Sequence, residues 1–302
     1  MLFAGDLGGT NLRLGLWDQG RLSHVRRFEV SELSGLEEAV STWMADAPPV
    51  RHACIGVAGP LDGNRCDHTN AGWAVDGDRL ARACGLESAL LINDFHAAAA
   101  GTLWLGEDDV EDMGGAIDDG PRVVIGAGTG LGVAIVAGGQ VISGEGGHQD
   151  FAPRGLLQRE ALAWLTERMG RVSFEQVCSG PGLMNLHAFM SARRSALPAD
   201  SPAQVVANAS RCSAAQQAVE MFVDIYGSFA GDMALLTRAT GGVWLAGGIA
   251  PKTRAWLSQR FRAAFEDKSP REHLLRPIGI RLITHPEPGL LGAGAVLSQR
   301  LG

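Results

Sequence analysis

The sequence predicts an α/β protein with two related halves. In its first half, short apolar runs typical of strands alternate with helical segments, which is the order that produces α/β folds. A strand, a glycine-rich turn containing a threonine and a second strand occupy residues 2–17, and the same arrangement recurs at residues 123–136. Because 302 residues exceed one typical hydrophobic core, we expect two domains.

The predicted elements follow the apolar patterns along the chain. In the first half we expect strands at residues 2–4, 12–17, 52–57 and 89–92, and helices at residues 36–44, 80–83 and 97–100. In the second half we expect strands at residues 123–125, 133–136, 243–246 and 280–284, and helices at residues 159–169, 174–177, 214–237, 251–265 and from 290 onward. Gly292 and Gly294 in the last helix indicate close packing on a neighbouring element.

An acidic, glycine-rich stretch at residues 106–120 separates the two halves. It lacks the alternate-position oxygen ligands, central glycine and distal glutamate of a calcium loop. We therefore interpret it as a solvated loop near a domain boundary.

Composition and charge exclude several classes of protein. A formal net charge of −7 argues against a nucleic-acid-binding surface. Residues 123–144 carry no charge, but repeated glycines and the absence of aromatic anchors favour a buried strand, turn and strand over a membrane span. The N-terminus shows no signal peptide, and five scattered cysteines without zinc-type spacing suggest reduced thiols. We expect a soluble, cytoplasmic protein that binds neither nucleic acid nor membrane.

The two glycine-rich turns are candidate phosphate-binding sites. Without Cβ atoms, the backbone N–H groups of such turns can converge on a phosphate, although each turn could equally be a plain tight hairpin. P-loop and dinucleotide fingerprints are absent. Asp6, in the first turn, could hold Mg²⁺ directly or through water, or could serve as an Asx-turn residue.

Asp94 lies where an apolar strand gives way to an alanine-rich helix. A carboxylate at this position is held by rigid backbone and could act as a general base for a substrate hydroxyl. The alternative is an aspartate that only caps the helix.

Several longer motifs resemble those of the bacterial glucokinase family. They are GDLGGTNLR (residues 5–13), LINDF (91–95), GAGTGLG (126–132), GEGGHQDFAP (144–153), SGPGL (179–183) and LAGGI (245–249), with residues 261–268 and 288–294 continuing the match. The resemblance covers nearly the whole chain. The chain lacks the zinc-binding cysteine cluster of the related ROK group, which favours the non-ROK branch.

The resemblance implies two actin-like (ribonuclease H-like) α/β domains with a substrate cleft between them. The small domain would comprise residues 1–105 and 286–302, and the large domain residues 106–285. The implied activity is ATP-dependent phosphorylation of D-glucose to glucose 6-phosphate by a homodimer, with ATP and Mg²⁺ as cofactors.

The resemblance also implies a role for each site residue. Asp94 would be the catalytic base, and the sugar hydroxyls would be bound by Asn93, Glu145, His148 and Glu175. The phosphates and adenosine would be bound by Gly8, Gly9, Thr10, Asn11, Gly128, Thr129, Gly130, Gly247 and Gly248, and Asp6 would hold Mg²⁺. Carboxylates, an amide and an imidazole suit sugar hydroxyls, which both donate and accept hydrogen bonds.

Alternative roles remain open at three of these positions and for the whole chain. Glu145 and His148 share the Glu-x-x-His spacing of di-iron helices, but the glycines between them disfavour a helix. Glu175 could instead stabilise the first turn of a helix through its dipole. For the chain, the alternatives are a kinase for mannose or an N-acetylated sugar and, less favoured, a sugar-sensing regulator, whereas an actin-like structural ATPase would not explain Glu145, His148 and Asn93 together.

Overall fold

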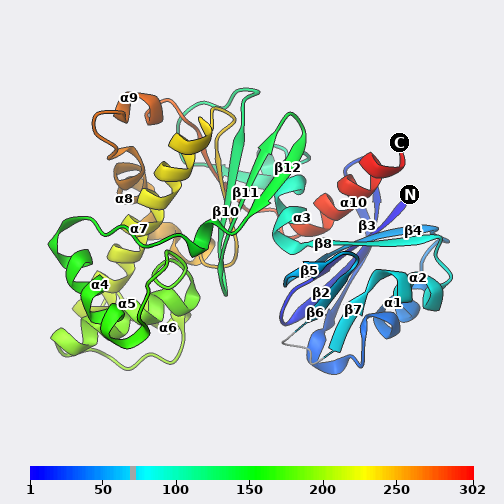
Figure 1. Ribbon diagram of the computed structural model, residues 1–302, viewed down its shortest axis with the longest axis horizontal. Helices are drawn as coiled ribbons and strands as arrows, with labels where there is room; N and C mark the ends of the chain where they lie inside the picture. Colours follow the sequence, from blue (N-terminus) through cyan, green and yellow to red (C-terminus); the bar gives the residue numbers. More distant parts are fainter. Residues whose placement is uncertain (69–72) are drawn as a thin grey trace. The chain divides into compact units, whose positions relative to one another are not determined.

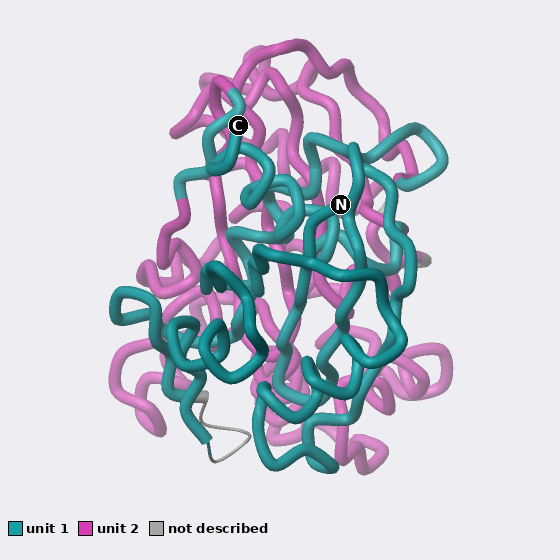
Figure 2. Tube along the Cα trace, turned by 90° about the vertical axis from the view of Figure 1, so that its right-hand side faces the viewer, with its two compact units in different colours: residues 1–109, 139–142, 285–302 teal, residues 110–138, 143–284 magenta. Residues whose placement is uncertain are grey.

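The computed structural model describes residues 1–68 and 73–302, which form two compact units (Figure 1). Unit 1 comprises residues 1–109, 139–142 and 285–302, and unit 2 comprises residues 110–138 and 143–284 (Figure 2). Each unit contains a mixed sheet accompanied by helices. The predicted α/β class is therefore confirmed.

The main sheet of unit 1 has five strands in the order β3-β2-β1-β4-β8. The first three are antiparallel neighbours, whereas β1, β4 and β8 run parallel. The strands are β1 (Leu2–Leu7), β2 (Asn11–Asp18), β3 (Arg21–Glu29), β4 (His52–Val57) and β8 (Ser88–Asn93), and a separate antiparallel sheet holds β5 (Leu61–Asp62), β6 (Arg65–His68) and β7 (Trp73–Asp76). The helices are η1 (Val30–Glu32), α1 (Leu36–Met44), α2 (Gly77–Cys84), α3 (Asp94–Gly101), η2 (Glu107–Asp109) and α10 (Pro288–Leu301).

Alternation along β1 places its side chains in two different cores. Phe3 and Leu7 pack in the cluster that includes apolar residues of α1 and α2. Ala4 packs in the cluster that includes α3 and α10. Because strand side chains alternate between faces, Asp6, two positions after Ala4, lies on the α3 and α10 face of the sheet.

Helices α3 and α10 pack with their backbones in contact, and Figure 1 shows them side by side. A Cβ added at Gly292 of α10 would collide with the carbonyl oxygen of Ala97 in α3, and one at Gly101 would collide with that of Pro288. Gly294 leaves no room for a side chain beside Trp17. The close packing predicted for Gly292 and Gly294 is confirmed.

The second large sheet, most of whose residues belong to unit 2, has six strands in the order β12-β11-β10-β13-β14-β9. Its strands are β9 (Val110–Asp112), β10 (Arg122–Ala127), β11 (Leu131–Ala137), β12 (Gln140–Gly144), β13 (Val243–Ala246) and β14 (Ile280–Ile283). Its helices are η3 (Gly146–His148), α4 (Gly155–Met169), α5 (Gly180–Arg193), α6 (Pro202–Asn208), α7 (Ser213–Thr237), η4 (Pro251–Thr253), α8 (Arg254–Glu266) and α9 (Glu272–Leu275).

The two sheets repeat one topology. In unit 1, β1 forms an antiparallel hairpin with β2 and pairs in parallel with β4. In unit 2, β10 forms an antiparallel hairpin with β11 and pairs in parallel with β13. Each hairpin closes at one of the glycine-rich turns that the sequence repeats. The relation between the halves that these turns suggested is therefore present in the strand order.

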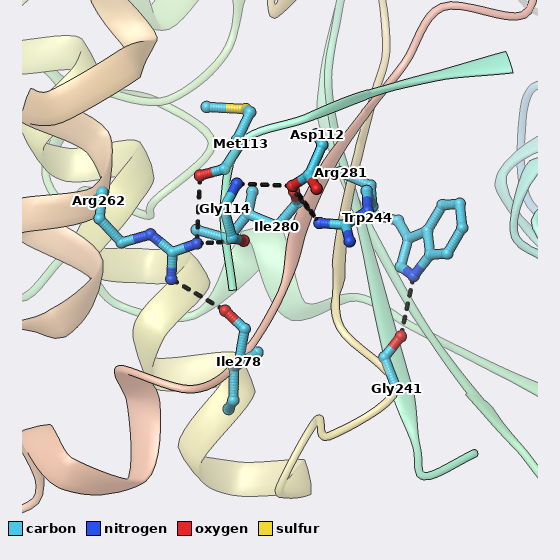
Figure 3. A network of polar contacts seen from close by, with 9 residues as sticks. All are labelled: Asp112, Met113, Gly114, Gly241, Trp244, Arg262, Ile278, Ile280 and Arg281. Carbon is cyan, nitrogen blue, oxygen red and sulfur yellow. Dashed lines mark hydrogen bonds and ion pairs between the residues drawn. The ribbon is translucent and has the colours of Figure 1, made fainter. Parts of the chain in front are cut away.

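Hydrogen bonds fasten the β9 edge of the unit 2 sheet (Figure 3). The guanidinium of Arg262 in α8 donates to the carbonyl oxygens of Ile278, Met113 and Gly114. Arg281 of β14 donates to a carboxylate oxygen of Asp112 at 2.6 Å. The Arg262 bonds join α8 to the residues that follow β9 and precede β14, and the Arg281 bond joins β14 to the edge strand β9.

Two sequence-based expectations were wrong in detail. Residues 106–120 are not only a loop, because β9 within them pairs with β14. Residues 174–177 form a turn instead of a helix, and the following helix begins only at Gly180. In the part of the chain that the structure describes, no helix is both long and apolar enough to cross a membrane.

Candidate active site

Asp94 is the first residue of α3, and Asn93 is the residue that caps this helix. The backbone N–H groups of Phe95 and His96 donate to Asn93 Oδ1 at 2.9 and 3.0 Å. The Phe95 N–H also lies 2.8 Å from Asp94 Oδ1. The half-buried Asp94 carboxylate therefore sits at the positive end of a helix, where negative charge is stabilised.

The close fit around Asp94 depends on a glycine in the neighbouring strand. A Cβ at Gly56 of β4 would lie 3.0 Å from the Cβ of Ala97 and 3.4 Å from the Cα of Asp94. Gly56 therefore allows the first turn of α3 to approach the sheet. This contact fixes the backbone that carries Asp94.

Asp6 lies within β1, paired with Arg13, and not in the turn where we expected it from the sequence, because the strand extends to Leu7. It forms part of a charged cluster with residues of other strands. Arg13 Nη1 lies 3.1 Å from Asp6 Oδ2, and the Asp6 side chain is only 17% exposed. Burial raises the pKa of Asp6 to about 6, an effect that the positive charge of Arg13 opposes. The negative charges of Asp94 and Glu287 raise this pKa further. The Asp6 and Asp94 carboxylates therefore interact electrostatically.

The first glycine-rich turn links β1 to β2. The Gly8 N–H donates to the carbonyl oxygen of Asn11 at 2.9 Å and closes the turn. Thr10 at its tip is exposed, while Gly8, Gly9 and Asn11 are half-buried. The turn presents accessible backbone beside Asp6, as a phosphate-binding turn requires.

The second glycine-rich turn, between β10 and β11, is also closed by a backbone hydrogen bond but is one residue shorter. The Gly128 N–H donates to the carbonyl oxygen of Gly130 at 2.8 Å, and Thr129 is exposed at the tip. The Gly180 N–H, at the start of α5, donates to the carbonyl oxygen of Gly128 at 2.8 Å. The N-terminal end of a 14-residue helix therefore adjoins this turn.

Gly247 and Gly248 follow β13 beside the end of β10. Gly247 has φ +84°, and a Cβ there would lie 2.5 Å from the carbonyl oxygen of Ala127. Only glycine tolerates both this conformation and this contact. Gly248 is exposed with open space around its Cα, so this bend leaves backbone accessible next to the second turn.

Glu145, His148 and Glu175 lie together in unit 2. His148 Nε2 is 3.9 Å from Glu145 Oε2 and 4.0 Å from Glu175 Oε1. The side chains of Glu145 and His148 are 89% and 56% exposed, so both can reach a ligand. The short 3-10 turn at residues 146–148 excludes the helical geometry of a di-iron Glu-x-x-His pair.

Glu175 also supports the second glycine-rich turn. Its Oε2 accepts a hydrogen bond from the Leu131 N–H at 2.9 Å, and a Cβ at Gly130 would lie 2.6 Å from that same oxygen. The expectation that Glu175 lies in the first turn of a helix was wrong, because Glu175 belongs to a turn before α5. One carboxylate oxygen fixes the turn, and the other faces His148.

The single carboxylate of Asp6 suits Mg²⁺ that is bound together with a nucleotide. It is less suited to a metal centre built from protein side chains alone. Among residues 1–68 and 73–302, no group of three or more His, Cys, Asp or Glu side chains could hold a metal ion. Mg²⁺ commonly binds through one or two carboxylates together with substrate phosphates and water. Asp6, a single carboxylate beside a glycine-rich turn, fits this pattern.

Sequence reasoning missed two charged partners of Asp6. Arg13 was present in the GDLGGTNLR motif, but its pairing with Asp6 follows from the β1–β2 register, in which the two residues face each other. Glu287 Oε2 lies 2.7 Å from Arg13 Nε. No sequence pattern marks Glu287, because its contact with Arg13 joins the two ends of the chain.

Comparison with known proteins gives a family. A family model described as Glucokinase matches residues 3–300. A glucokinase from Yersinia enterocolitica is 39% identical over 311 residues, covering 99% of this chain and 96% of that protein. The chain belongs to the glucokinase family. It is therefore a glucokinase by enzyme class, a kinase that uses ATP, as its motifs implied.

Solved structures agree with this membership. The glucokinase from an Antarctic psychrotroph superposes with a TM-score of 0.88 at 29% identity, covering 99% of this chain and 98% of that chain. A ROK family glucokinase from Streptomyces griseus, described in complex with glucose and AMPPNP, superposes with a TM-score of 0.69 at 20% identity and 99% coverage of both chains. The second match concerns the fold alone. Together they confirm the fold class that the resemblance implied.

Proposed function

We propose that this glucokinase transfers the γ-phosphoryl group of ATP to the 6-hydroxyl of D-glucose, with Asp94 as the base that accepts the hydroxyl proton. The observation that carries the proposal is that Asn93, and not Asp94, caps the start of α3. Asn93 Oδ1 accepts the capping hydrogen bonds, so Asp94 is not needed as the cap. A carboxylate held by a helix terminus and a strand end is positioned for proton transfer.

We assign the sugar hydroxyls to four side chains. Asn93 offers its Nδ2 group, which has no hydrogen bond to the described residues, while its Oδ1 remains occupied by the α3 cap. Glu145 and His148 offer exposed polar groups, and Glu175 offers the Oε1 that faces His148. This set combines donors and acceptors, as several hydroxyl groups require.

We assign the nucleotide to the glycine-rich segments. Backbone N–H groups at Gly8, Gly9, Thr10 and Asn11, and at Gly128, Thr129 and Gly130, would bind phosphate oxygens, and Gly247 with Gly248 would line the adenosine site. Asp6 would hold Mg²⁺ of the Mg–ATP substrate, directly or through water, and the ion would neutralise phosphate charge in the transition state.

Catalysis in this proposal consists mainly of positioning. Phosphoryl transfer passes through a loose transition state with little covalent chemistry for the protein to perform. The sugar-binding side chains orient the attacking hydroxyl, and Asp94 removes its proton as the bond to phosphorus forms. The turns supply N–H groups where negative charge accumulates.

Sugar-stimulated ADP release by the purified protein tests this function. With Mg–ATP and a panel of glucose, mannose and N-acetylated hexoses, we expect glucose to give the highest kcat/KM and a product identified as glucose 6-phosphate. Preference for mannose or an N-acetylated sugar would replace glucose as the substrate while retaining the kinase. The proposal fails if no hexose stimulates ADP formation.

Three further features of the enzyme are proposed with it. Residues 1–105 with 286–302 would form the small domain, and residues 106–285 the large domain. The enzyme would be a homodimer, which sedimentation velocity would show as a species of twice the 31.8 kDa chain mass. A cytoplasmic location fits its five free cysteines, because disulfides are rare in that compartment.

A further inference from the structure

Glu287 is a buried carboxylate between two arginines. It is the residue immediately before α10, and only 8% of its surface is exposed. Its Oε2 lies 2.7 Å from Arg13 Nε, and its Oε1 accepts a hydrogen bond from Arg27 Nη2 at 2.7 Å. A buried carboxylate is costly unless charged donors compensate it, and these two guanidiniums do so.

Arg13 is shared between Glu287 and Asp6. Its Nε lies 2.7 Å from Glu287 Oε2 as an ion pair without hydrogen-bond geometry, whereas its Nη1 donates to Asp6 Oδ2 at 3.1 Å. The Arg13 guanidinium therefore lies between two carboxylates and pairs with both, and Arg27 donates to the other oxygen of Glu287. The order of charges across β1, β2, α10 and β3 is Asp6, Arg13, Glu287 and Arg27.

The first turn of α10 also contacts Asp6 sterically. A Cβ at Gly289 would lie 3.0 Å from Asp6 Cγ and 3.1 Å from each of its carboxylate oxygens. Since Gly289 stands two residues after Glu287, one helix end covers Asp6 and holds Arg13. The Glu287 N–H in turn donates to His285 Nδ1 at 3.0 Å, which fixes the backbone leading into the helix.

We propose that Glu287 is a positioning residue for the phosphate-binding end of β1: it holds Arg13 in its bridging orientation and balances the charge of Arg13, so that Asp6 stays available to the Mg²⁺ of Mg–ATP. This inference rests on the proposed role of Asp6. Glu287 does not touch substrate in this scheme and acts only through Arg13.

The sign of the charge effect follows from the order of the four groups. Without Glu287, the full positive charge of Arg13 is directed at Asp6 and adds repulsion toward a divalent cation. Without Arg27, the negative charge of Glu287 is less compensated, and the local potential becomes more favourable to the cation. Substitutions of Glu287 and Arg27 are therefore expected to act in opposite directions.

Binding of a non-hydrolysable ATP analogue, measured by calorimetry across a Mg²⁺ series, tests the proposal without relying on activity. For Glu287→Gln we expect the Mg²⁺ concentration that gives half-maximal analogue binding to rise about three- to tenfold. For Arg27→Met, whose side chain is 56% exposed, we expect no change or a lower value. Glu287→Asp, which keeps the charge, is expected to recover part of the loss.

Two controls separate a positioning role from a structural one. Glucose binding without nucleotide should be the same in all three variants, and their melting temperatures should establish that they are folded. If Glu287→Gln is folded and binds glucose but shows an unchanged Mg²⁺ requirement, or if it shifts in the same direction as Arg27→Met, the inference is overturned.

Asp6→Asn tests the underlying assignment separately. We expect this variant to lose the Mg²⁺ dependence of analogue binding altogether. If Asp6→Asn keeps the wild-type dependence, Asp6 is not the Mg²⁺ residue, and the proposed function changes at that position. A shift in Glu287→Gln together with no effect in Asp6→Asn would then show that Glu287 acts on nucleotide binding by another route.

Discussion

Asn93 caps the helix that Asp94 begins. Its Oδ1 accepts hydrogen bonds from two backbone N–H groups of the first turn, and Asp94 occupies the next position with its carboxylate at the positive end of α3. The sequence left two roles open for Asp94, base or cap. The structure gives the cap to its neighbour, and this division makes the two roles separable by mutation.

Asp94→Asn is expected to lower kcat by about 10²- to 10⁴-fold, the usual contribution of a general base, while glucose affinity changes little. Asn93 still caps α3, so the melting temperature should stay near that of the wild type. Single-turnover kinetics with Mg–ATP and calorimetric glucose titration measure both quantities. Wild-type turnover in this variant would move the base to another residue.

Asn93→Ala is expected to lose about 0.5–2 kcal/mol of stability, because two N–H groups lose their acceptor. Asn93→Asp keeps an acceptor oxygen at the favourable end of the helix but removes the amide donor that we assign to the sugar. We therefore expect Asn93→Asp to retain stability and to bind glucose more weakly. Equal glucose affinity in wild type and Asn93→Asp would contradict the assignment, and urea unfolding measures the stability.

Gly292→Ala should destabilise the protein by at least about 1–3 kcal/mol, because its Cβ would overlap the backbone of Ala97 and the two helices would have to separate. Gly106→Ala is the matched control, since its nearest neighbour would be an Asp109 carboxylate oxygen at an ordinary 3.7 Å. Chemical denaturation compares the two variants. Similar midpoints would show that α3 and α10 tolerate a wider spacing.

Arg262→Met should cost about 2–5 kcal/mol, because the carbonyls of Ile278 and Met113 lose a charged donor, whereas that of Gly114 keeps the Ile280 N–H. Arg260→Met, on the same helix, removes a more exposed ion pair with Asp224, and such pairs contribute about 0–1 kcal/mol. The Arg262 side chain is 19% exposed and that of Arg260 44%. A larger loss for Arg260→Met in thermal unfolding would refute the interpretation of Figure 3.

Cys212 is expected to be the cysteine whose labelling rate reaches its plateau at the lowest pH. Backbone hydrogen bonds, chiefly from Ala215 and then from Leu197, lower the pKa of its thiol. Burial raises the pKa of Cys84, and that of Cys54 to about 12. Because the thiolate is the nucleophile, the alkylation rate of Cys212 should level off at a lower pH than that of a free cysteine.

Iodoacetamide labelling of the native protein, followed by peptide mass spectrometry over a pH series, measures these rates. Cys212→Ser identifies the labelled peptide. Since Cys212 is only 8% exposed, the plateau pH is the decisive quantity and not the absolute rate. The prediction is wrong if the labelling rate of Cys212 rises with pH in the same way as that of a free cysteine.

Regular apolar patterns made much of the fold predictable. The helix at residues 36–44 and the strands at residues 52–57 and 243–246 have the predicted bounds, because the helix has one buried apolar face and the two strands are short apolar runs buried on both faces. The strand at Arg21–Glu29 was missed, since it is a mostly exposed edge strand with the polar sequence RLSHVRRFE. Its pairing with β2, and not its own composition, makes it a strand.

Other errors came from local signals that tertiary contacts override. Helix α5 was missed because Gly180-Pro181-Gly182 resembles a loop, although Ser179 and Pro181 are ordinary helix-start residues. Glu175 was assigned to a helix, but its bond to the Leu131 N–H holds residues 174–177 in a turn. Glu287 could not be found from sequence, because its partners are distant along the chain.

The return of α10 to unit 1 also sets an order of assembly during translation. All of unit 2 leaves the ribosome before residues 285–302 appear, and domains generally fold as they are synthesised. Until α10 emerges, Asp6 has no Gly289 covering it, and Arg13 and Arg27 have no Glu287 between them. The nucleotide-binding turn of unit 1 therefore stays incomplete throughout the synthesis of unit 2, and ATP binding is delayed until α10 has been made.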